Sequence, residues 1–206
     1  MKAVLILVGL VLVGAVGIQM AAVGGAWWFH HNKQYDLEIR WLEDLAPVAA
    51  WDAKYQAQIG RLYLERVRRH LDSGRIDLAV LAVRRARARD RSLGLATHRD
   101  LVSLGIEAYT RAADRMEAHG RLIAAADWDD SLFVLAVRAA EPHHRYAAIA
   151  AFMEGLDLRV RAGQPCAALA RVEWGKRGLG GTIPNVQPSV EDDLRQQCRR
   201  ARRYRR

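Results

Sequence analysis

The first 28 residues contain the longest apolar stretch of the chain. Residues 3–28 carry no charged side chain, and Gln19 is the only strongly polar residue among them. A helix needs about 20 apolar residues to cross the hydrocarbon core of a bilayer, so this stretch is long enough to span it. The pattern predicts a transmembrane signal-anchor helix over residues 1–29.

A cleaved signal peptide is the alternative interpretation of this stretch. The apolar region of a signal peptide runs for about 7 to 15 residues and ends at a small-x-small site, which residues 24–26 (Gly-Gly-Ala) would provide. The greater length of the run favours a retained helix. Trp27 and Trp28 then stand where an aromatic belt holds the end of a helix at the membrane surface.

Beyond this stretch, hydrophobic positions recur with the helical period, and glycine or proline marks the breaks. Ile76, Ala79, Val80 and Val83, for example, share one helical face. Residues 30–47 are expected to form a helical stalk that leaves the membrane and ends at Pro47. Further helices are expected over residues 47–71, 76–88, 97–119, 122–141, 145–162 and 165–177, followed by a loop over 178–188 and a last helix that starts at Ser189.

The composition supports an all-α fold. The chain is rich in Ala, Leu and Arg, which are strong helix formers, and its five prolines lie where the predicted helices begin or end. The pattern therefore predicts that residues 48–194 form one domain of antiparallel helical hairpins. Three hairpins break at Gly74, Gly120 and Gly163, and a C-terminal helix caps them.

Two of these breaks share a pattern of small and apolar residues. A glycine is followed five, nine and twelve residues later by a small, a medium-sized apolar and a small residue, which resembles the second half of a tetratricopeptide (TPR) repeat. The middle hairpin departs from the pattern at its last two positions. The three sets are Ala79, Val83 and Ala86 after Gly74; Ala125, Asp129 and Leu132 after Gly120; and Ala168, Val172 and Gly175 after Gly163.

The resemblance covers residues 48–177 and has limits. The glycines are spaced by 46 residues (74 to 120) and 43 residues (120 to 163), whereas a TPR unit has about 34. The resemblance implies a solenoid that binds partner proteins along a groove, as single-span envelope proteins with such domains do when they serve as assembly adaptors. We expect that groove to be lined by Arg84, Arg87, Arg111 and Arg115.

Positive charge is concentrated at the C-terminus. The chain has a formal charge of +9, but the final twelve residues contain seven arginines and no acid, which leaves +2 for residues 1–194. Such a segment attracts anionic lipid headgroups and, in the cytosol, nucleic acid. The basic tail, residues 195–206, consists of Arg195, Arg199, Arg200, Arg202, Arg203, Arg205 and Arg206 among other residues.

The two cysteines give information about the compartment in which the domain lies. Cys166 begins one predicted helix and Cys198 lies late in the next, so an antiparallel arrangement of the two helices would bring them to the same level. A disulfide there would add on the order of 3 kcal/mol and indicate an oxidising compartment. The alternative is two buried thiols. The positive-inside rule leaves the orientation close to a tie, and the cysteines favour an exported domain.

Catalytic and metal-binding patterns are lacking in the sequence. The adjacent pairs His30-His31 and His143-His144 point in different directions on a helix and chelate poorly. Residues 127–130 (Asp-Trp-Asp-Asp) supply carboxylates but no partner constellation, so we expect them to form a solvated face. No catalytic residue, metal site or cofactor is predicted.

The sequence thus predicts a scaffold protein of the bacterial cell envelope rather than an enzyme. It would be a single-pass protein of the cytoplasmic membrane with most of its chain in the periplasm, where it binds other envelope proteins. The alternative is a cytosol-facing, membrane-tethered binder of nucleic acid or anionic lipid that acts through its arginine-rich segments. Export would exclude nucleic acid as a partner.

Overall fold

Every regular element in the described part of the chain is a helix, which confirms the all-α prediction. The computed structural model describes residues 2–32, 34–49, 53–89, 95–139, 141–179, 181 and 186–204. Its helices are α1 (Lys2–His31), α2 (Tyr35–Ala49), α3 (Ala53–Asp72), α4 (Ile76–Ala88), α5 (Leu95–Ala118), α6 (Leu122–Arg138), α7 (Pro142–Arg161), α8 (Pro165–Leu179) and α9 (Pro188–Tyr204).

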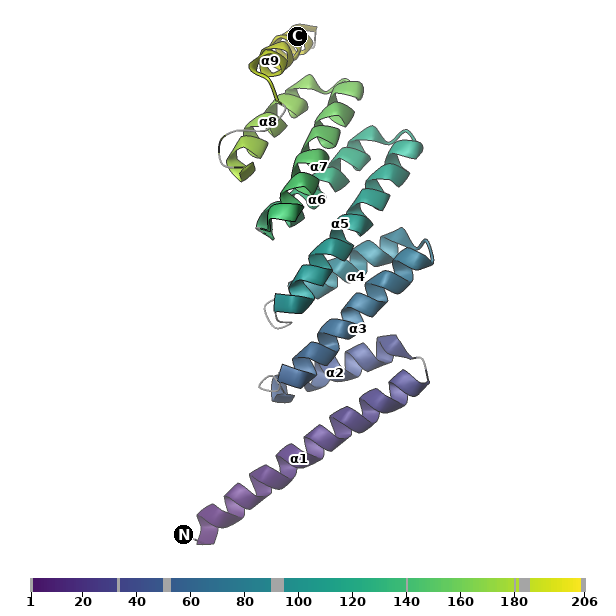
Figure 1. Ribbon diagram of the computed structural model, residues 1–206, viewed down its shortest axis with the longest axis vertical. Helices are drawn as coiled ribbons and strands as arrows, with labels where there is room; N and C mark the ends of the chain where they lie inside the picture. The colour runs from purple at the N-terminus through teal and green to yellow at the C-terminus, as the bar shows by residue number, and fades with distance from the viewer. Residues whose placement is uncertain are drawn as a thin grey trace.

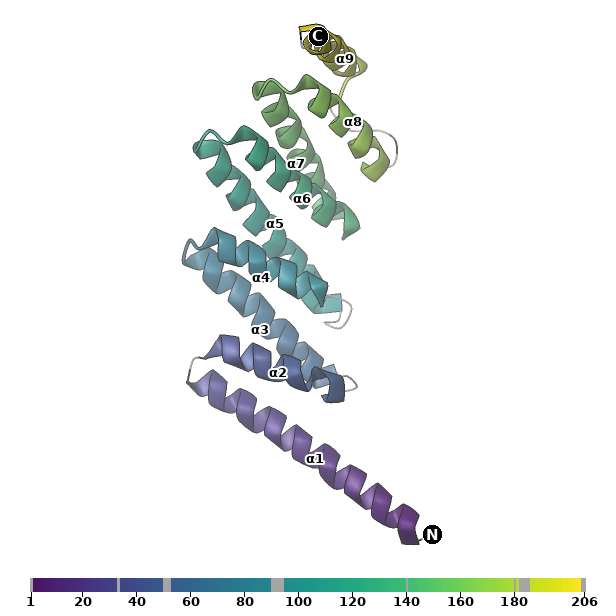
Figure 2. The ribbon, with the colours of Figure 1, turned by 180° about the vertical axis from the view of Figure 1, so that it is seen from behind.

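The helices form antiparallel hairpins that stack along one direction (Figure 1). Helices α1, α3, α5 and α7 make one layer, and α2, α4, α6 and α8 make the other, as the view from behind shows (Figure 2). Each helix packs mainly on its neighbours in sequence. The two termini therefore lie at opposite ends of an elongated molecule, and α9 covers the C-terminal end (Figure 1).

The three predicted breaks are confirmed as turns of one type. Gly74, Gly120 and Gly163 have φ angles of 68°, 71° and 70°, in the left-handed region that glycine enters without the steric cost of a Cβ. Each turn also closes with a backbone hydrogen bond from the residue after the glycine to the carbonyl five residues earlier, as in a Schellman motif. These bonds run from Arg75 to His70 (2.8 Å), from Arg121 to Met116 (2.9 Å) and from Gln164 to Arg159 (2.9 Å).

The helix after each turn buries equivalent positions. Ala79, Ala125 and Ala168, five residues after the glycines, are all 0% exposed, and their small side chains allow the paired helices to approach closely. The residues nine positions after the glycines are also buried, but their side chains differ in chemistry. Val83 and Val172 are 0% exposed, and Asp129 is 4% exposed.

The predicted stalk over residues 30–47 differs from the structure. Helix α1 ends at His31, and α2 runs back along it as the second helix of a first hairpin (Figure 1). Ile39 and Leu42 of α2 are buried in a cluster with Ile59 and Leu62 of α3. An isolated stalk would leave these apolar side chains in water, so α2 packs into the domain instead. Helix α2 also continues past Pro47 to Ala49.

The basic tail is helical in its described part. Residues 195–204 continue helix α9, so the last helix includes Cys198, as expected from the sequence. Leu194 and Cys198 lie on the buried side of α9, so packing of this side against α8 extends the helix into the arginine-rich region. Arg205 and Arg206 lie outside the described residues.

Among the helices of the described residues, none is long and apolar enough to cross a membrane. The predicted span of residues 3–28 includes residues 3–12, whose side chains lie outside the described part of the chain.

Candidate functional site

An open groove between α4 and α6 contains two of the four arginines predicted to bind partners. Its volume is about 340 Å³. Helix α4 contributes arginines, α5 an aromatic side chain, and α6 acidic, hydroxyl and apolar groups. The lining residues are Arg84, Arg87, Tyr109, Asp130, Ser131 and Val134.

Arg84 of this groove is positioned by an aromatic side chain and not by an acid. The guanidinium carbon of Arg84 lies 5.1 Å from the centre of the Trp128 ring, and Trp128 itself stacks on Tyr109 at 5.8 Å. Neither Arg84 nor Arg87 forms an ion pair with another described residue. Both guanidinium groups can therefore receive an anionic group from outside the chain.

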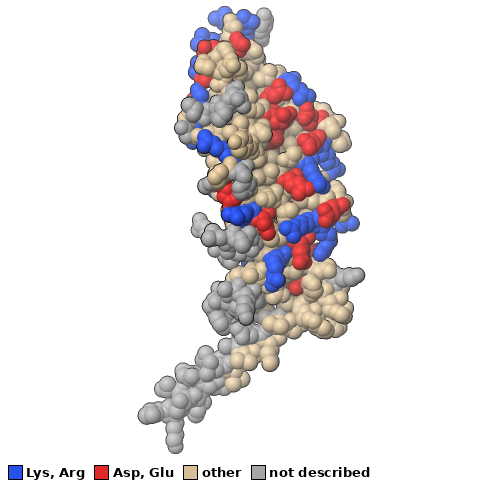
Figure 3. Space-filling model, viewed as in Figure 1, with Lys and Arg blue, Asp and Glu red and all other residues tan. Residues whose placement is uncertain are grey.

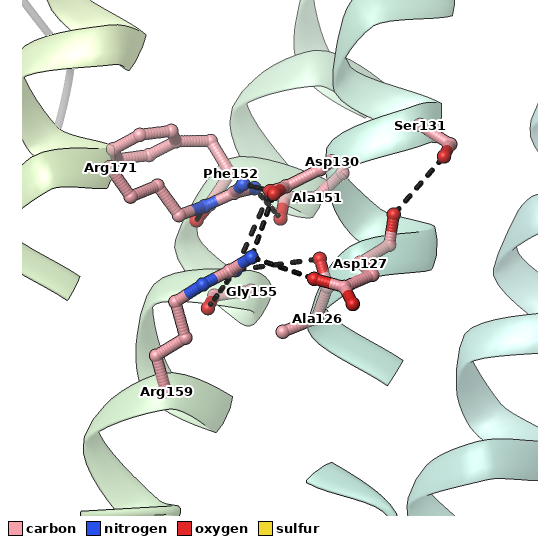
Figure 4. Close-up of polar contacts among 9 residues, drawn as sticks. All are labelled: Ala126, Asp127, Asp130, Ser131, Ala151, Phe152, Gly155, Arg159 and Arg171. Atoms are coloured by element: carbon pink, nitrogen blue, oxygen red, sulfur yellow. Dashed lines mark hydrogen bonds and ion pairs between the residues drawn. The ribbon is translucent and has the colours of Figure 1, made fainter. Parts of the chain in front are cut away.

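On the other side of α6, a buried charged cluster joins α6, α7 and α8 (Figure 4). Asp130, which lines the groove, also pairs with Arg159 of α7 at 2.7 Å and with Arg171 of α8. Arg159 and Arg171 are only 8% and 4% exposed. Asp130 thus belongs both to the groove and to the packing between hairpins.

Main-chain carbonyls also accept hydrogen bonds from these two arginines (Figure 4). Arg159 donates to the carbonyl of Gly155 at 3.0 Å, and it also pairs with Asp127 at 3.1 Å. Arg171 donates to the carbonyls of Ala151 at 3.1 Å and Phe152 at 3.3 Å. Charged groups are stable in the interior only when their polar atoms are paired in this way.

Asp129 lies next to this cluster but is bonded less completely. Burial raises its pKa to about 7; the carboxylates Glu154 and Asp114 add to the rise, and Arg171 and Arg159 oppose it. Its Oδ2 atom is buried without a hydrogen-bond partner among the described residues. Burial likewise lowers the pKa of Arg171 to about 10.

A glycine of α7 makes room for the charged groups. A Cβ atom at Gly155 would lie 2.9 Å from a guanidinium nitrogen of Arg171 and 3.1 Å from the Cβ of Asp129. Both distances are shorter than ordinary van der Waals contacts. The absence of a side chain at this position therefore allows α6, α7 and α8 to meet around the cluster.

The prediction of a solvated acidic face over residues 127–130 was wrong for most of this segment. Asp127 is exposed, but Asp129 is buried, Trp128 packs against the core, and Asp130 is half-buried in the ion pairs above. The sequence does contain a signal for this burial. Asp129 is the ninth residue after Gly120, the position that buried valines occupy in the other two hairpins.

The other two predicted arginines lie elsewhere, near the α3–α4 turn. Arg111 of α5 donates to the carbonyl of Leu71 at 3.0 Å and pairs with Glu107 at 2.6 Å. Arg115 pairs with Asp77 at 3.4 Å. These contacts connect α5 to the preceding hairpin. The structure therefore does not bring all four predicted arginines into one groove.

Cys166 and Cys198 lie at disulfide-bonding distance, with their Cα atoms 4.7 Å apart. This separation is within the usual range for a disulfide, and the common level predicted for the two residues in an antiparallel pair is confirmed. Lys176 of α8 pairs with Glu191 of α9 at 2.6 Å, so α9 is joined to α8 at two points.

The remaining predicted residues lie near the two ends of the molecule. Trp27 and Trp28, in the last turns of α1, are 64% and 59% exposed. At the other end, Arg195 pairs with Asp192 at 2.9 Å and with Glu191. The other described arginines of the tail are exposed on α9: Arg199, Arg200, Arg202 and Arg203.

Comparison of this chain with known proteins finds no matching family model, no matching curated protein and no matching solved structure.

Proposed function

We propose that this protein is a membrane-anchored interaction scaffold whose groove between α4 and α6 binds an acidic segment of a partner protein. The observation that carries the proposal is the pair Arg84 and Arg87, which line one groove without an acidic partner from the described residues. Surface arginines near carboxylates normally form ion pairs, as Arg111 does. Arg84 and Arg87 are available to a ligand.

The chemistry of the groove favours a protein segment that contains both acidic and apolar side chains. Two guanidinium groups provide forked donors for carboxylates, while Tyr109 and Val134 offer apolar surface beside them. The elongated stack presents such grooves between successive hairpins, as helical solenoids do when they bind extended partners. This arrangement also supports the resemblance to TPR domains as part of the proposal.

The membrane anchor rests on the uncharged run of residues 3–28. It is supported by the apolar side chains on one face of α1, which no other part of the described chain covers. They are exposed by between 54% and 74%, a cost in water that a surrounding bilayer would remove. These residues are Val13, Val16, Met20, Val23 and Trp27.

We place the helical hairpins in the periplasm because Cys166 and Cys198 are positioned to form a disulfide, and disulfides persist in oxidising compartments. Alkylation of the protein from intact cells, before and after reduction, should differ by two modified thiols. Two thiols that react before reduction would contradict export.

The exposed arginines of α9 favour a second candidate function. Arg199, Arg200, Arg202 and Arg203 are exposed at the C-terminal end of the stack, where they would attract anionic lipid headgroups or, in the cytosol, nucleic acid. A compartment-specific reporter fused to the C-terminus separates this cytosol-facing function from the periplasmic scaffold.

Site-specific photo-crosslinking tests the groove directly. A photoreactive amino acid at Val134 of the full-length protein should give discrete adducts with envelope proteins, and the double variant Arg84→Glu/Arg87→Glu should abolish them. The matched control Arg75→Glu/Arg121→Glu reverses two exposed arginines in hairpin turns outside the groove and should retain them. Adducts that survive the Arg84 and Arg87 changes would refute the proposed binding site.

A further inference from the structure

A second pocket lies between α1, α2 and α3, at the point where the apolar helix joins the first hairpins. Its volume is about 450 Å³. Val23, Ala26 and Trp27 of α1 and Leu62 of α3 provide an apolar wall. The polar lining groups are His30 of α1, Glu38 of α2, and Gln58, Arg61 and Glu65 of α3.

One acidic group is built into the interior of this pocket. Glu38 is 1% exposed, and its Oε2 atom lies 3.1 Å from Nδ1 of His30. A carboxylate only accepts hydrogen bonds, so Nδ1 is the donor. In neutral His30 the other ring nitrogen, Nε2, is then an acceptor. The pocket thus presents acceptors for a cationic ligand.

The outer rim carries charges of both signs. Arg61 and Glu65 are one helical turn apart on α3, where side chains four residues apart are neighbours. Both are exposed, and neither forms an ion pair with another described residue. These two neighbouring residues therefore offer a guanidinium for an anionic group and a carboxylate for a cationic group.

The apolar wall continues along α1 away from the pocket. Trp27, Val23, Met20, Val16 and Val13 follow one another at intervals of four and three residues, which places them on a single helical face. Counted from Ala3, about 20 residues of helix cross the hydrocarbon core. If α1 is the anchor proposed above, Val23 to His30 therefore lie at the level of the lipid headgroups.

We propose that this pocket binds a phospholipid with a primary-amine headgroup. Its ammonium group donates to Glu65 and to Nε2 of His30, beside the buried Glu38, and its phosphate accepts from Arg61. One acyl chain lies along the exposed face of α1. This inference rests on the proposed membrane anchor and adds the lipid that the anchored domain selects.

The charges of the pocket discriminate between headgroups. An anionic glycerol headgroup would meet two carboxylates, Glu38 and Glu65, without a cation of its own to neutralise them. A choline headgroup carries a positive charge but has no N–H group to donate. The pocket should therefore prefer phosphatidylethanolamine to phosphatidylglycerol and phosphatidylcholine.

Native mass spectrometry of the full-length protein in mild detergent tests this selectivity. Each of the three lipids, with identical acyl chains, is titrated separately. We expect phosphatidylethanolamine to bind about tenfold more tightly than the others, the factor that one charge-assisted hydrogen bond supplies. The variant Arg61→Gln/Glu65→Gln changes only exposed side chains and should lose most of this preference, because only the acceptor on His30 remains.

A control variant on the same helix separates the pocket from general surface charge. Arg68→Gln/Asp72→Asn removes an arginine and an acid at the same spacing, two turns further along α3 and outside this pocket. It should retain the preference. Equal binding of the three lipids to the unchanged protein, or loss of the preference in the control, would overturn the lipid site.

Membrane fractionation distinguishes failure of the site from failure of the anchor. Protein that resists extraction by alkaline carbonate but shows no lipid preference would refute the pocket and leave the anchor intact. Protein that carbonate releases would refute the anchor and the lipid site together.

Discussion

Helix α6 has a charged region on each side, and the two regions use arginine in opposite ways. Toward α7 and α8, Arg159 and Arg171 are almost fully buried and bonded to carboxylates and main-chain carbonyls. Toward α4, Arg84 is exposed and Arg87 is half-buried, and neither forms an ion pair with another described residue. An arginine that is buried and paired with carboxylates or carbonyls supports the fold, whereas one without such partners is available for binding.

Figure 3 shows why sequence alone does not make this distinction. Acidic and basic side chains are interspersed over the face of the molecule in that view, so no single region of positive charge identifies a binding surface there. The distinction depends on which arginine has a carboxylate or carbonyl within reach, and those partners come from other helices.

The largest expected effect comes from removing one arginine of the buried cluster. Arg171→Ala leaves the carbonyls of Ala151 and Phe152 without their donor and removes the cation beside Asp129 and Asp130. Breaking a buried pair in this way costs about 3–5 kcal/mol. Chemical unfolding of the full-length protein in detergent measures the loss.

Arg177→Ala is the matched control, because Arg177 lies on the same helix and is exposed. Its effect should be within about 0.5 kcal/mol. A loss below about 1 kcal/mol for Arg171→Ala would show that the buried arginine is no more important to the fold than an exposed one.

The next effect is a dependence of stability on pH through Asp129. Its pKa rises from 3.8 to about 7 on folding. Below pH 3.8 the carboxyl group is protonated in both states; between pH 3.8 and about 7 the folded state keeps a proton that the unfolded state releases. The free energy of unfolding therefore falls as pH rises through this window, by on the order of 4 kcal/mol from this group.

Asp129→Asn should remove this component of the pH dependence. Other groups with shifted pKa values, such as Glu191, titrate in both proteins, so the difference between the two unfolding profiles isolates Asp129. The exposed neighbour Asp127, changed to Asn, is the control and should leave the slope above pH 4 unchanged. A difference profile that is flat from pH 4 to pH 7 would contradict the burial of an ionisable Asp129.

Local features of the fold were predictable from the sequence, because their causes are local. Gly74, Gly120 and Gly163 mark turns that require a left-handed residue, and the small residues five positions later mark the close approach of the paired helices. Cys166 and Cys198 could be predicted to lie side by side on antiparallel helices, because the loop between the two helices lies midway between them in the sequence.

Features that depend on distant residues were not predictable in the same way. The burial of Asp129 depends on Arg159 and Arg171, which follow it by 30 and 42 residues and belong to other helices. The segment predicted as a stalk packs into the domain because α3 supplies an apolar surface for Ile39. Arg84 and Arg111 looked alike in sequence, but only Arg111 has a carbonyl and a carboxylate within reach.

Arg111 should have an effect of intermediate size. Arg111→Ala removes a hydrogen bond to the carbonyl of Leu71 and an ion pair with Glu107. The guanidinium is partly exposed, so water can replace part of what is lost, and a decrease of about 1 kcal/mol is expected. Thermal unfolding compared with Arg75→Ala measures it, since the side chain of Arg75 is exposed in a turn. Equal effects would place Arg111 among the arginines that are available for binding.

The smallest expected effect on stability belongs to the two groove arginines. Arg84→Glu/Arg87→Glu removes no ion pair with a described residue, and Asp130 keeps its partners Arg159 and Arg171. The free energy of unfolding should therefore change by no more than about 0.5 kcal/mol, although the variant reverses two charges. The stacking of Arg84 on Trp128 is the one described contact that is lost, so Arg84→Gln serves as the control for it. A loss of about 3 kcal/mol or more, within the range set by the buried cluster, would show that these arginines also support the fold and that the contrast between the two sides of α6 is not real.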